Sequence, residues 1–268
     1  MTALEAVSAS EYRGDDGLLY CGECDAPKQG RIDSLRDSPI IFRRRCNCER
    51  EEEIEAEIER MQAQCIKSDK FRRATFADDD GADRQTGDIL RRYAEKWQEM
   101  RRENIGLLLH GEVGGGKTFW SACIANAIIE ADARSGSNSG RRGPVLMTTV
   151  QTLRDEAQKD FGAQKARVLE TVREIGLLIL DDFGFEKKTS AADELLFDIV
   201  NARYDSGRPL IITTNLTTDE LSNAQDVKAR RIYDRVIEMC QPIHVSGEGR
   251  RRAIAKSKGE KARRILGI

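Results

Sequence analysis

Residues 111–118 read GEVGGGKT and fit the phosphate-binding pattern G-x-x-x-x-G-K-[S/T] at every fixed position. Glycines let successive backbone N–H groups close around phosphate oxygens, while the lysine adds a cation and the threonine a Mg²⁺ ligand. An apolar run precedes the segment and a helical pattern follows it, so the positive end of a helix faces the same anion. The segment therefore predicts a site for ATP or GTP. The residues expected at the nucleotide are Gly111, Val113, Gly114, Gly115, Gly116, Lys117, Thr118 and Phe119.

Polar side chains follow two further apolar runs. Residues 175–180 lead into Asp181 and Asp182, and residues 209–214 lead into Asn215. Parallel strands deliver such residues to one sheet edge, where the nucleotide lies. We expect Asp181 to help Thr118 hold Mg²⁺, Asp182 to orient and deprotonate the attacking water, and Asn215 to sense the γ-phosphate or position that water. The alternative interpretation is that the two acidic residues simply end a buried strand and that Asn215 is a turn residue; it would be favoured if the sequence had no phosphate loop.

Four cysteines form two close pairs, Cys21 with Cys24 and Cys46 with Cys48. Two such pairs can close a tetrahedral Zn²⁺ site, and a short segment with few large apolar residues needs one to fold. Four ordinary reduced cysteines are the alternative, whereas a redox centre is disfavoured because no βαβ pattern surrounds the C-x-x-C pair. The other cysteines lie in apolar periodic stretches and are expected in the core: Cys65, Cys123 and Cys240.

The pattern of apolar residues, turns and charges divides the chain. In chain order we expect a flexible leader (1–17), a zinc-binding module (18–48), an amphipathic helix and a hinge-like linker (49–87), a nucleotide-binding domain (88–248) and a basic tail (249–268). Within the domain, a helix at 89–102 precedes short apolar runs that alternate with helical segments. This alternation predicts an α/β fold with a mainly parallel sheet and helices on both faces. The expected strands are 105–110, 145–150, 175–180, 209–214 and 242–246.

Charge is balanced overall but unevenly placed. The net charge of -2 neither favours nor opposes a nucleic-acid partner. Residues 49–60 include seven Glu, whereas residues 250–264 include eight Lys or Arg, and this basic end is either a partner surface or only a solvated helix or tail. No run approaches the roughly 18 apolar residues of a membrane span, and the N-terminus lacks an export signal. We therefore expect a cytoplasmic protein with no membrane contact.

The order of phosphate loop, strand-Asp-Asp and strand-Thr-Thr-Asn resembles that of the AAA+ ATPases. The segments LLILDDFG, RPLIITTNL and KARRIYDRVIEMCQPIHVSGEGRRR are more similar still to replicative helicase loaders of the DnaC type, with IstB transposition ATPases as near relatives. This resemblance covers residues 71–252. The family's positions fall on Lys117 and Thr118 (Walker A), Asp181 and Asp182 (Walker B), Asn215 (sensor 1), Arg231 and Arg235 (the latter as arginine finger), and Arg251 (a final sensor arginine, placed within 250–252).

The resemblance implies an ATP-controlled homo-oligomer that binds the replicative hexameric helicase through its N-terminal module and loads it onto single-stranded DNA. Hydrolysis is expected to be slow and to depend on the oligomer or on DNA, because Asp182 stands where many AAA+ proteins have Glu and because no helical lid follows the last strand. The implied DNA contact is residues 152–174, although an ordinary amphipathic helix pair explains them equally well. The basic and aromatic residues of that stretch are Lys159, Phe161, Lys165 and Arg167.

Two other functions fit parts of this pattern. An IstB-type ATPase that assists a transposase would share the nucleotide domain, and only the cysteine module weighs against it. A small-molecule kinase would share the phosphate loop but would lack the strand-borne Thr-Thr-Asn and the RIYDR arginines.

Overall fold

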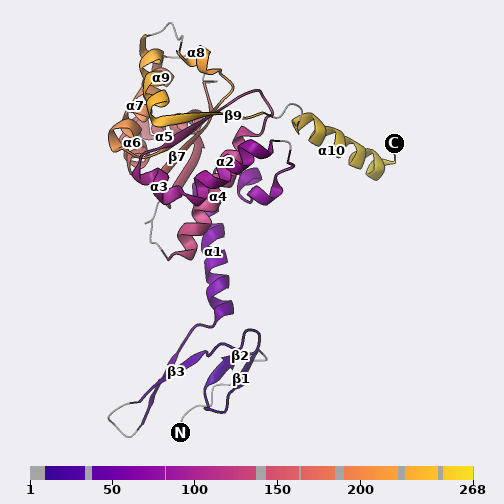
Figure 1. The fold of residues 1–268 in the computed structure, drawn as a ribbon. Helices are drawn as coiled ribbons and strands as arrows, with labels where there is room; N and C mark the ends of the chain where they lie inside the picture. The colour runs from indigo at the N-terminus through magenta and orange to yellow at the C-terminus, as the bar shows by residue number, and fades with distance from the viewer. Residues whose placement is uncertain are drawn as a thin grey trace. The chain divides into compact units, whose positions relative to one another are not determined.

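The computed structural model describes residues 10–33, 38–81, 83–136, 143–162, 164–184, 190–222, 227–246 and 250–267 (Figure 1). The chain separates into two compact units, with the division after Arg60. The described helices are α1 (Asn47–Cys65), α2 (Arg84–Glu95), α3 (Trp97–Arg102), α4 (Lys117–Arg134), α5 (Val150–Ala157), α6 (Lys165–Glu174), α7 (Ser190–Ser206), α8 (Thr218–Ser222), α9 (Val227–Met239) and α10 (Arg250–Leu266). None of them is long and apolar enough to span a bilayer.

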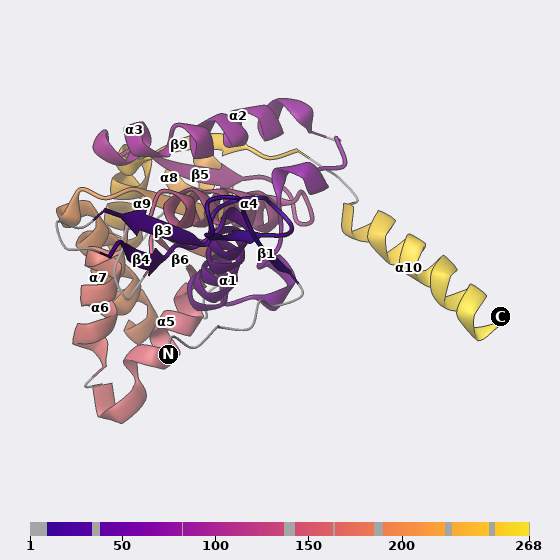
Figure 2. The ribbon, with the colours of Figure 1, turned by 90° about the horizontal axis from the view of Figure 1, so that it is seen from below.

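The N-terminal unit contains two antiparallel ribbons. Strand β1 (Glu11–Arg13) pairs with β2 (Leu19–Cys21). Strand β3 (Gln29–Ile32) pairs with β4 (Ile40–Arg43), and these two strands lie side by side in Figure 2. Strand β1 falls inside the segment expected to be an unstructured leader, so that expectation is wrong for residues 11–13. A strand of three residues is too short to produce a readable alternation, and only its pairing with β2 defines it.

The stretch expected to be a hinge is packed against the nucleotide-binding domain instead. The Asn126 side chain on α4 donates hydrogen bonds to the carbonyls of Phe71 (3.0 Å) and Ala74 (2.8 Å). The Phe76 ring lies 6.0 Å from the ring of Trp120, also on α4. These contacts fasten the two short 3₁₀ turns of the segment, Asp69–Phe71 and Phe76–Asp78, to α4.

The single helix expected at residues 89–102 is two helices, α2 and α3, separated at Lys96. Helix α2 also begins earlier than expected, because the Asp83 carboxylate caps it by accepting a hydrogen bond from the Thr86 N–H (3.2 Å). The sequence pattern missed this first turn because it has few apolar residues.

All five expected strands of the second unit are present, and every pair is parallel. The order across the sheet is β6-β7-β8-β5-β9. Helices α5, α6, α7 and α9 share one core with alternate strand residues, while α2 and α4 pack together outside that core. This arrangement confirms the predicted α/β fold. The strand bounds are β5 (Gly106–His110), β6 (Val145–Thr149), β7 (Leu177–Phe183), β8 (Leu210–Thr214) and β9 (Cys240–His244).

A fully buried arginine, Arg203 near the end of α7, connects three parts of this core. Its Nη1 donates to the carbonyls of Val172 and Ile175, both at 2.9 Å, and its Nη2 donates to those of Gly176 and Pro209. These carbonyls belong to the end of α6 and to the residues that lead into β7 and β8. Burial lowers the pKa of Arg203 to about 9, because loss of solvent disfavours the charged guanidinium, and the neighbouring charge of Arg208 adds to this shift.

Replacing Arg203 with Met should lower the free energy of unfolding by about 3 kcal/mol or more, because several buried carbonyls would lose their donor. Urea unfolding followed by circular dichroism measures the change. The matched control is Arg208→Met, since Arg208 is only half-buried and lies five residues away. Equal stabilities of the two variants would contradict the assigned role.

Candidate nucleotide and metal sites

The phosphate loop fills the turn between β5 and α4, as its sequence predicts. Three of its glycines have positive φ: Gly111 (141°), Gly114 (92°) and Gly116 (97°). A methyl group at Gly111 would overlap the Val245 carbonyl, and one at Gly115 would come within 3.1 Å of the same oxygen. The loop therefore lies directly against the backbone that follows β9, which is too close for any residue with a side chain at position 111.

The lysine and the asparagine singled out in the sequence meet at this loop. Lys117 is buried, and its Nζ donates to the Asn215 Oδ1 (2.6 Å) and to the carbonyls of Gly111 and Glu112 (both 2.8 Å). The ammonium group is thus already positioned at the mouth of the loop. An entering phosphate oxygen would replace one of these three acceptors.

A threonine on β8 organises the two aspartates. The Thr213 hydroxyl donates to the Asp181 carboxylate (2.6 Å) and accepts from the Asp182 N–H (2.9 Å). The Thr118 hydroxyl donates to the same Asp181 oxygen (2.9 Å). Burial raises the pKa of Asp181 above its ordinary value, so a nearby cation would stabilise its charged form.

Asp182 is held differently from Asp181. It has a positive φ of 55° in a bulge between β7 and β8, and its side chain is exposed. The sequence predicted both aspartates but missed Thr213. The available signal was strand alternation, since Thr213 lies two residues before Asn215 and so points to the same side.

The other predicted nucleotide residues lie away from this cluster or at its rim. Arg235 on α9 has its guanidinium over the rings of Phe197 (5.7 Å) and Tyr204 (5.1 Å), both on α7. Arg231, on the same helix, is exposed, and so is Val113 in the loop. The Phe119 ring packs 5.2 Å from that of Trp120. The side chain of Arg251 lies outside the described residues, although its backbone belongs to α10.

The chain's only two histidines lie side by side at the ends of β5 and β9. The ring centroids of His110 and His244 are 5.3 Å apart, and His110 immediately precedes the phosphate loop. Burial, and then the nearby His244 and Lys117, lower the pKa of His110. The sequence pattern does not reveal this pair, because the parallel register that joins residues 110 and 244 is a product of the fold.

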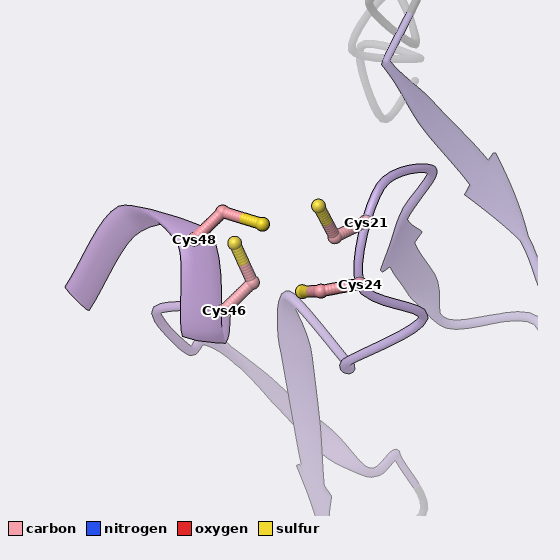
Figure 3. Close-up of side chains that lie close together, drawn as sticks. All are labelled: Cys21, Cys24, Cys46 and Cys48. Carbon is pink, nitrogen blue, oxygen red and sulfur yellow. The ribbon is translucent and has the colours of Figure 1, made fainter. Parts of the chain in front are cut away.

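The four cysteines of the N-terminal unit converge on one point. Figure 3 shows their sulfur atoms facing one another, and all four lie within 4.8 Å of each other. Sulfur atoms around a tetrahedral ion with bonds of about 2.3 Å would be about 3.8 Å apart. Cys21 and Cys46 are buried, while Cys24 and Cys48 are half-buried. The cluster therefore has the composition and size to hold a metal ion.

Backbone N–H groups point at these sulfur atoms. Those of Cys48 and Ala26 lower the pKa of the Cys24 thiol to about 6. The Glu49 N–H donates to the Cys46 sulfur (3.4 Å), while the Glu49 carboxylate accepts from the Cys46 N–H (3.1 Å). This reciprocal pair is a capping box at the start of α1, in which a thiol takes the place of a hydroxyl.

The expected DNA-contacting cations are largely paired with neighbours. The Lys159 ammonium contacts the Glu156 carboxylate (2.5 Å), and the Lys165 ammonium contacts Glu194 (3.1 Å) and Asp198 (2.8 Å) on α7. Arg167 donates to the Gln164 side chain, just before α6 (3.4 Å), and makes no ion pair with a carboxylate among the residues that the structure describes. The side chain of Phe161 is outside the described part of the chain.

Comparison with known proteins identifies the nucleotide domain. A family model for IstB-like ATP binding proteins matches residues 47–258. The chain belongs to this family. Its members are AAA+ P-loop proteins that bind and hydrolyse ATP. The match begins after Cys46, so most of the N-terminal unit precedes it.

The curated relatives include both a helicase loader and an insertion-sequence ATP-binding protein. The replicative helicase loader DnaI of Bacillus subtilis is 30% identical over 156 residues, which are 54% of this chain and 47% of that protein. The chain therefore spans about half the length of that relative. A putative ATP-binding protein of an insertion sequence from Mycobacterium tuberculosis is 28% identical over 208 residues, which are 74% of this chain and 76% of that protein.

Solved structures agree on the fold. A crystal structure of DnaI aligns with a TM-score of 0.55 at 25% identity and covers 71% of this chain and 99% of that one. A crystal structure of the DnaC helicase loader aligns with a TM-score of 0.51 at 20% identity, covering 67% of this chain and 100% of that one. The second likeness concerns the fold alone.

Replacing Lys117 with Ala should reduce ATP affinity at least about a hundredfold, because the ammonium group is the cation nearest the predicted phosphate position. Isothermal titration calorimetry with ATP and Mg²⁺ measures this loss. The control is Lys96→Ala, which removes an exposed lysine that lies outside the loop, between α2 and α3. Unchanged affinity in the Lys117 variant would contradict the assignment.

Proposed function

We propose that this protein is an ATP-dependent DNA replication factor that binds a replicative hexameric helicase in the cytoplasm and loads it onto single-stranded DNA. ATP binding and slow hydrolysis act as the switch. The observation that carries the proposal is the combination of a DnaI-like nucleotide domain with a separate N-terminal unit that has an exposed apolar ribbon. The alignment covers about half of DnaI, and the proposed role is for this whole protein.

The geometry of the nucleotide site supports the following roles. Thr118 and Asp181 would hold Mg²⁺, since their side chains already meet at 2.9 Å. Exposed Asp182 would orient and deprotonate the attacking water, and Asn215 would sense the γ-phosphate in place of its present contact with Lys117. The aspartate at residue 182 reaches less far than a glutamate would, which favours slow turnover.

The arginine roles require a second copy of the chain. Arg235 lies on aromatic rings of α7 and has no described contact with its own phosphate loop, while its Nη1 is buried without a hydrogen-bond partner among the described residues. A guanidinium held in this way is pre-oriented, so we propose that it acts as an arginine finger toward a neighbouring subunit in a homo-oligomer. Arg231 and Arg251 are also proposed to contact nucleotide, as the resemblance implies.

The ribbon β3–β4 offers a surface for the helicase. Ile32, Ile40 and Phe42 lie on one face of it, because Ile32 pairs with Ile40 and Phe42 pairs with Gly30. Their exposed fractions are 56%, 58% and 41%. A methyl group at Gly30 would overlap the Phe42 ring, so that ring lies across β3. An apolar face of this kind on a small unit is typical of a protein-binding site.

Zinc is the metal proposed for the cysteine cluster. Four thiolates with closed, tetrahedral spacing are the ligand set of structural zinc sites. A single iron ion can take the same four ligands, and elemental analysis distinguishes the two metals. The metal would join the turn after β2 to the start of α1, across a unit that has few buried apolar side chains. The fold of the N-terminal unit would then depend on it.

Purified protein should contain about one zinc ion per chain, and replacing both Cys46 and Cys48 with Ser should abolish it. Elemental analysis by mass spectrometry measures the content, with Cys123→Ser as the control because Cys123 is buried on α4, in the other unit. Protein prepared without chelators that contains no metal would refute the zinc assignment.

A role as helper of a transposase is the second candidate. The family model describes IstB-like proteins, and the insertion-sequence relative is aligned over more of its length than DnaI is. Against this stands the N-terminal unit, most of which precedes the family match. The choice between the two depends on the partner that this unit binds.

The protein should capture the purified replicative helicase of its source organism in the presence of ATP. Replacing Ile40 and Phe42 together with Ser should reduce capture at least about tenfold without changing ATP affinity, since the ribbon would lose most of its apolar face. The control is Ile265→Ser with Leu266→Ser, which removes two exposed apolar side chains from α10. Capture of a purified transposase but not of the helicase would favour the second candidate.

A further inference from the structure

Positive charge is concentrated on α10. The segment 250–266 contains eight Lys or Arg and one Glu, which gives it a net charge of +7. Subtracting this from the chain's net charge of -2 leaves -9 for all other residues. A helix with a net charge of +7 on an otherwise acidic chain is suited to a polyanionic partner.

The described cations of α10 are exposed. They carry no ion pair among the residues that the structure describes, whereas cations elsewhere, such as Lys165 and Arg134, have carboxylate partners. Glu260 is the only acidic residue of the helix. The described cations of α10 are Lys256, Lys258, Lys261, Arg263 and Arg264.

The distribution of these cations distinguishes between kinds of partner. At 100° per residue they spread over about 220° of the helix circumference, and they cover about 12 Å of its length. A helix that binds in a protein groove presents a narrow stripe of apolar anchors three or four residues apart, and the large apolar residues of α10 are only Ile254, Ile265 and Leu266. A membrane-surface helix would carry aromatic residues and leucines along one face. A phosphate backbone, by contrast, accepts cations from a broad surface.

We propose that α10 is a nucleic-acid-binding helix that contacts the phosphate backbone without reading the bases. It is a second DNA contact, additional to residues 152–174, where most of the candidate cations are paired with carboxylates. The proposal does not depend on the helicase, because it concerns only the charge and exposure of α10.

The test is the affinity of the full-length protein for a fluorescein-labelled 25-nucleotide single strand, measured by anisotropy between 50 and 200 mM salt. The test variant replaces the five described cations of α10 with Gln. The control variant removes the same charge from exposed positions elsewhere in the second unit: Lys67, Lys70, Lys96, Arg101 and Arg102. ATP affinity and circular dichroism show whether each variant is folded.

We expect the α10 variant to bind at least about tenfold more weakly at 50 mM salt and to reduce the slope of log affinity against log salt by up to about 3.5. The control should change affinity less than about threefold. A matching loss with a 25-base-pair duplex would extend the contact to both nucleic-acid forms.

Two results would overturn the proposal. One is unchanged DNA affinity in the α10 variant, and the other is an equal loss in both variants, which would reflect only net charge. If DNA affinity is unchanged and helicase capture is lost, α10 binds an acidic protein surface instead. Failure of helicase capture by the unmodified protein would leave the anisotropy result intact, so the two proposals fail separately.

Discussion

The guanidinium of Arg203 fixes the starting points of two neighbouring strands. Its donors reach the end of α6 and the carbonyls of Gly176 and Pro209, which immediately precede β7 and β8. Once the two strands begin in register, each residue rises by the same distance along both strands, so residues equally far from the starts come level. Thr213 therefore meets Asp181 at 2.6 Å. The arrangement of the candidate catalytic side chains at one sheet edge thus depends on a buried hydrogen-bonding group at the opposite edge.

Much of the fold could be predicted because parallel strands that are buried on both faces read as short apolar runs. The phosphate loop could be predicted because its glycines, lysine and threonine are each required by phosphate geometry. The elements that were missed or misjudged are local ones without a periodic signal. Strand β1 is defined by its partner, α2 by the Asp83 cap, and the packed segment after α1 by hydrogen bonds from Asn126.

The candidate sites show the same division. Lys117, Thr118, Asp181 and Asn215 were expected together because the phosphate loop and the ends of two strands lie at one sheet edge. Their side chains do meet in two pairs, Lys117 with Asn215 and Thr118 with Asp181. Thr213 and the pair of histidines were missed, because their roles depend on register between strands distant in sequence. Arg235 could be identified only by resemblance. Within its own chain it contacts aromatic rings, and the nucleotide proposed for it belongs to a neighbouring subunit.

The chain order of these elements has a consequence for synthesis on the ribosome. All four thiols of the N-terminal cluster lie within the first 48 residues, and Cys46 with Glu49 caps α1, so this unit can close before any strand of the parallel sheet exists. Strand β5, by contrast, cannot pair when it is made, since both of its neighbours, β8 and β9, are made more than 90 residues later. The phosphate loop after β5 lies against Val245 and must therefore wait for almost the entire chain to emerge. Nucleotide can stabilise only the last stage of folding, whereas a metal ion held by the cysteine cluster would act on the first.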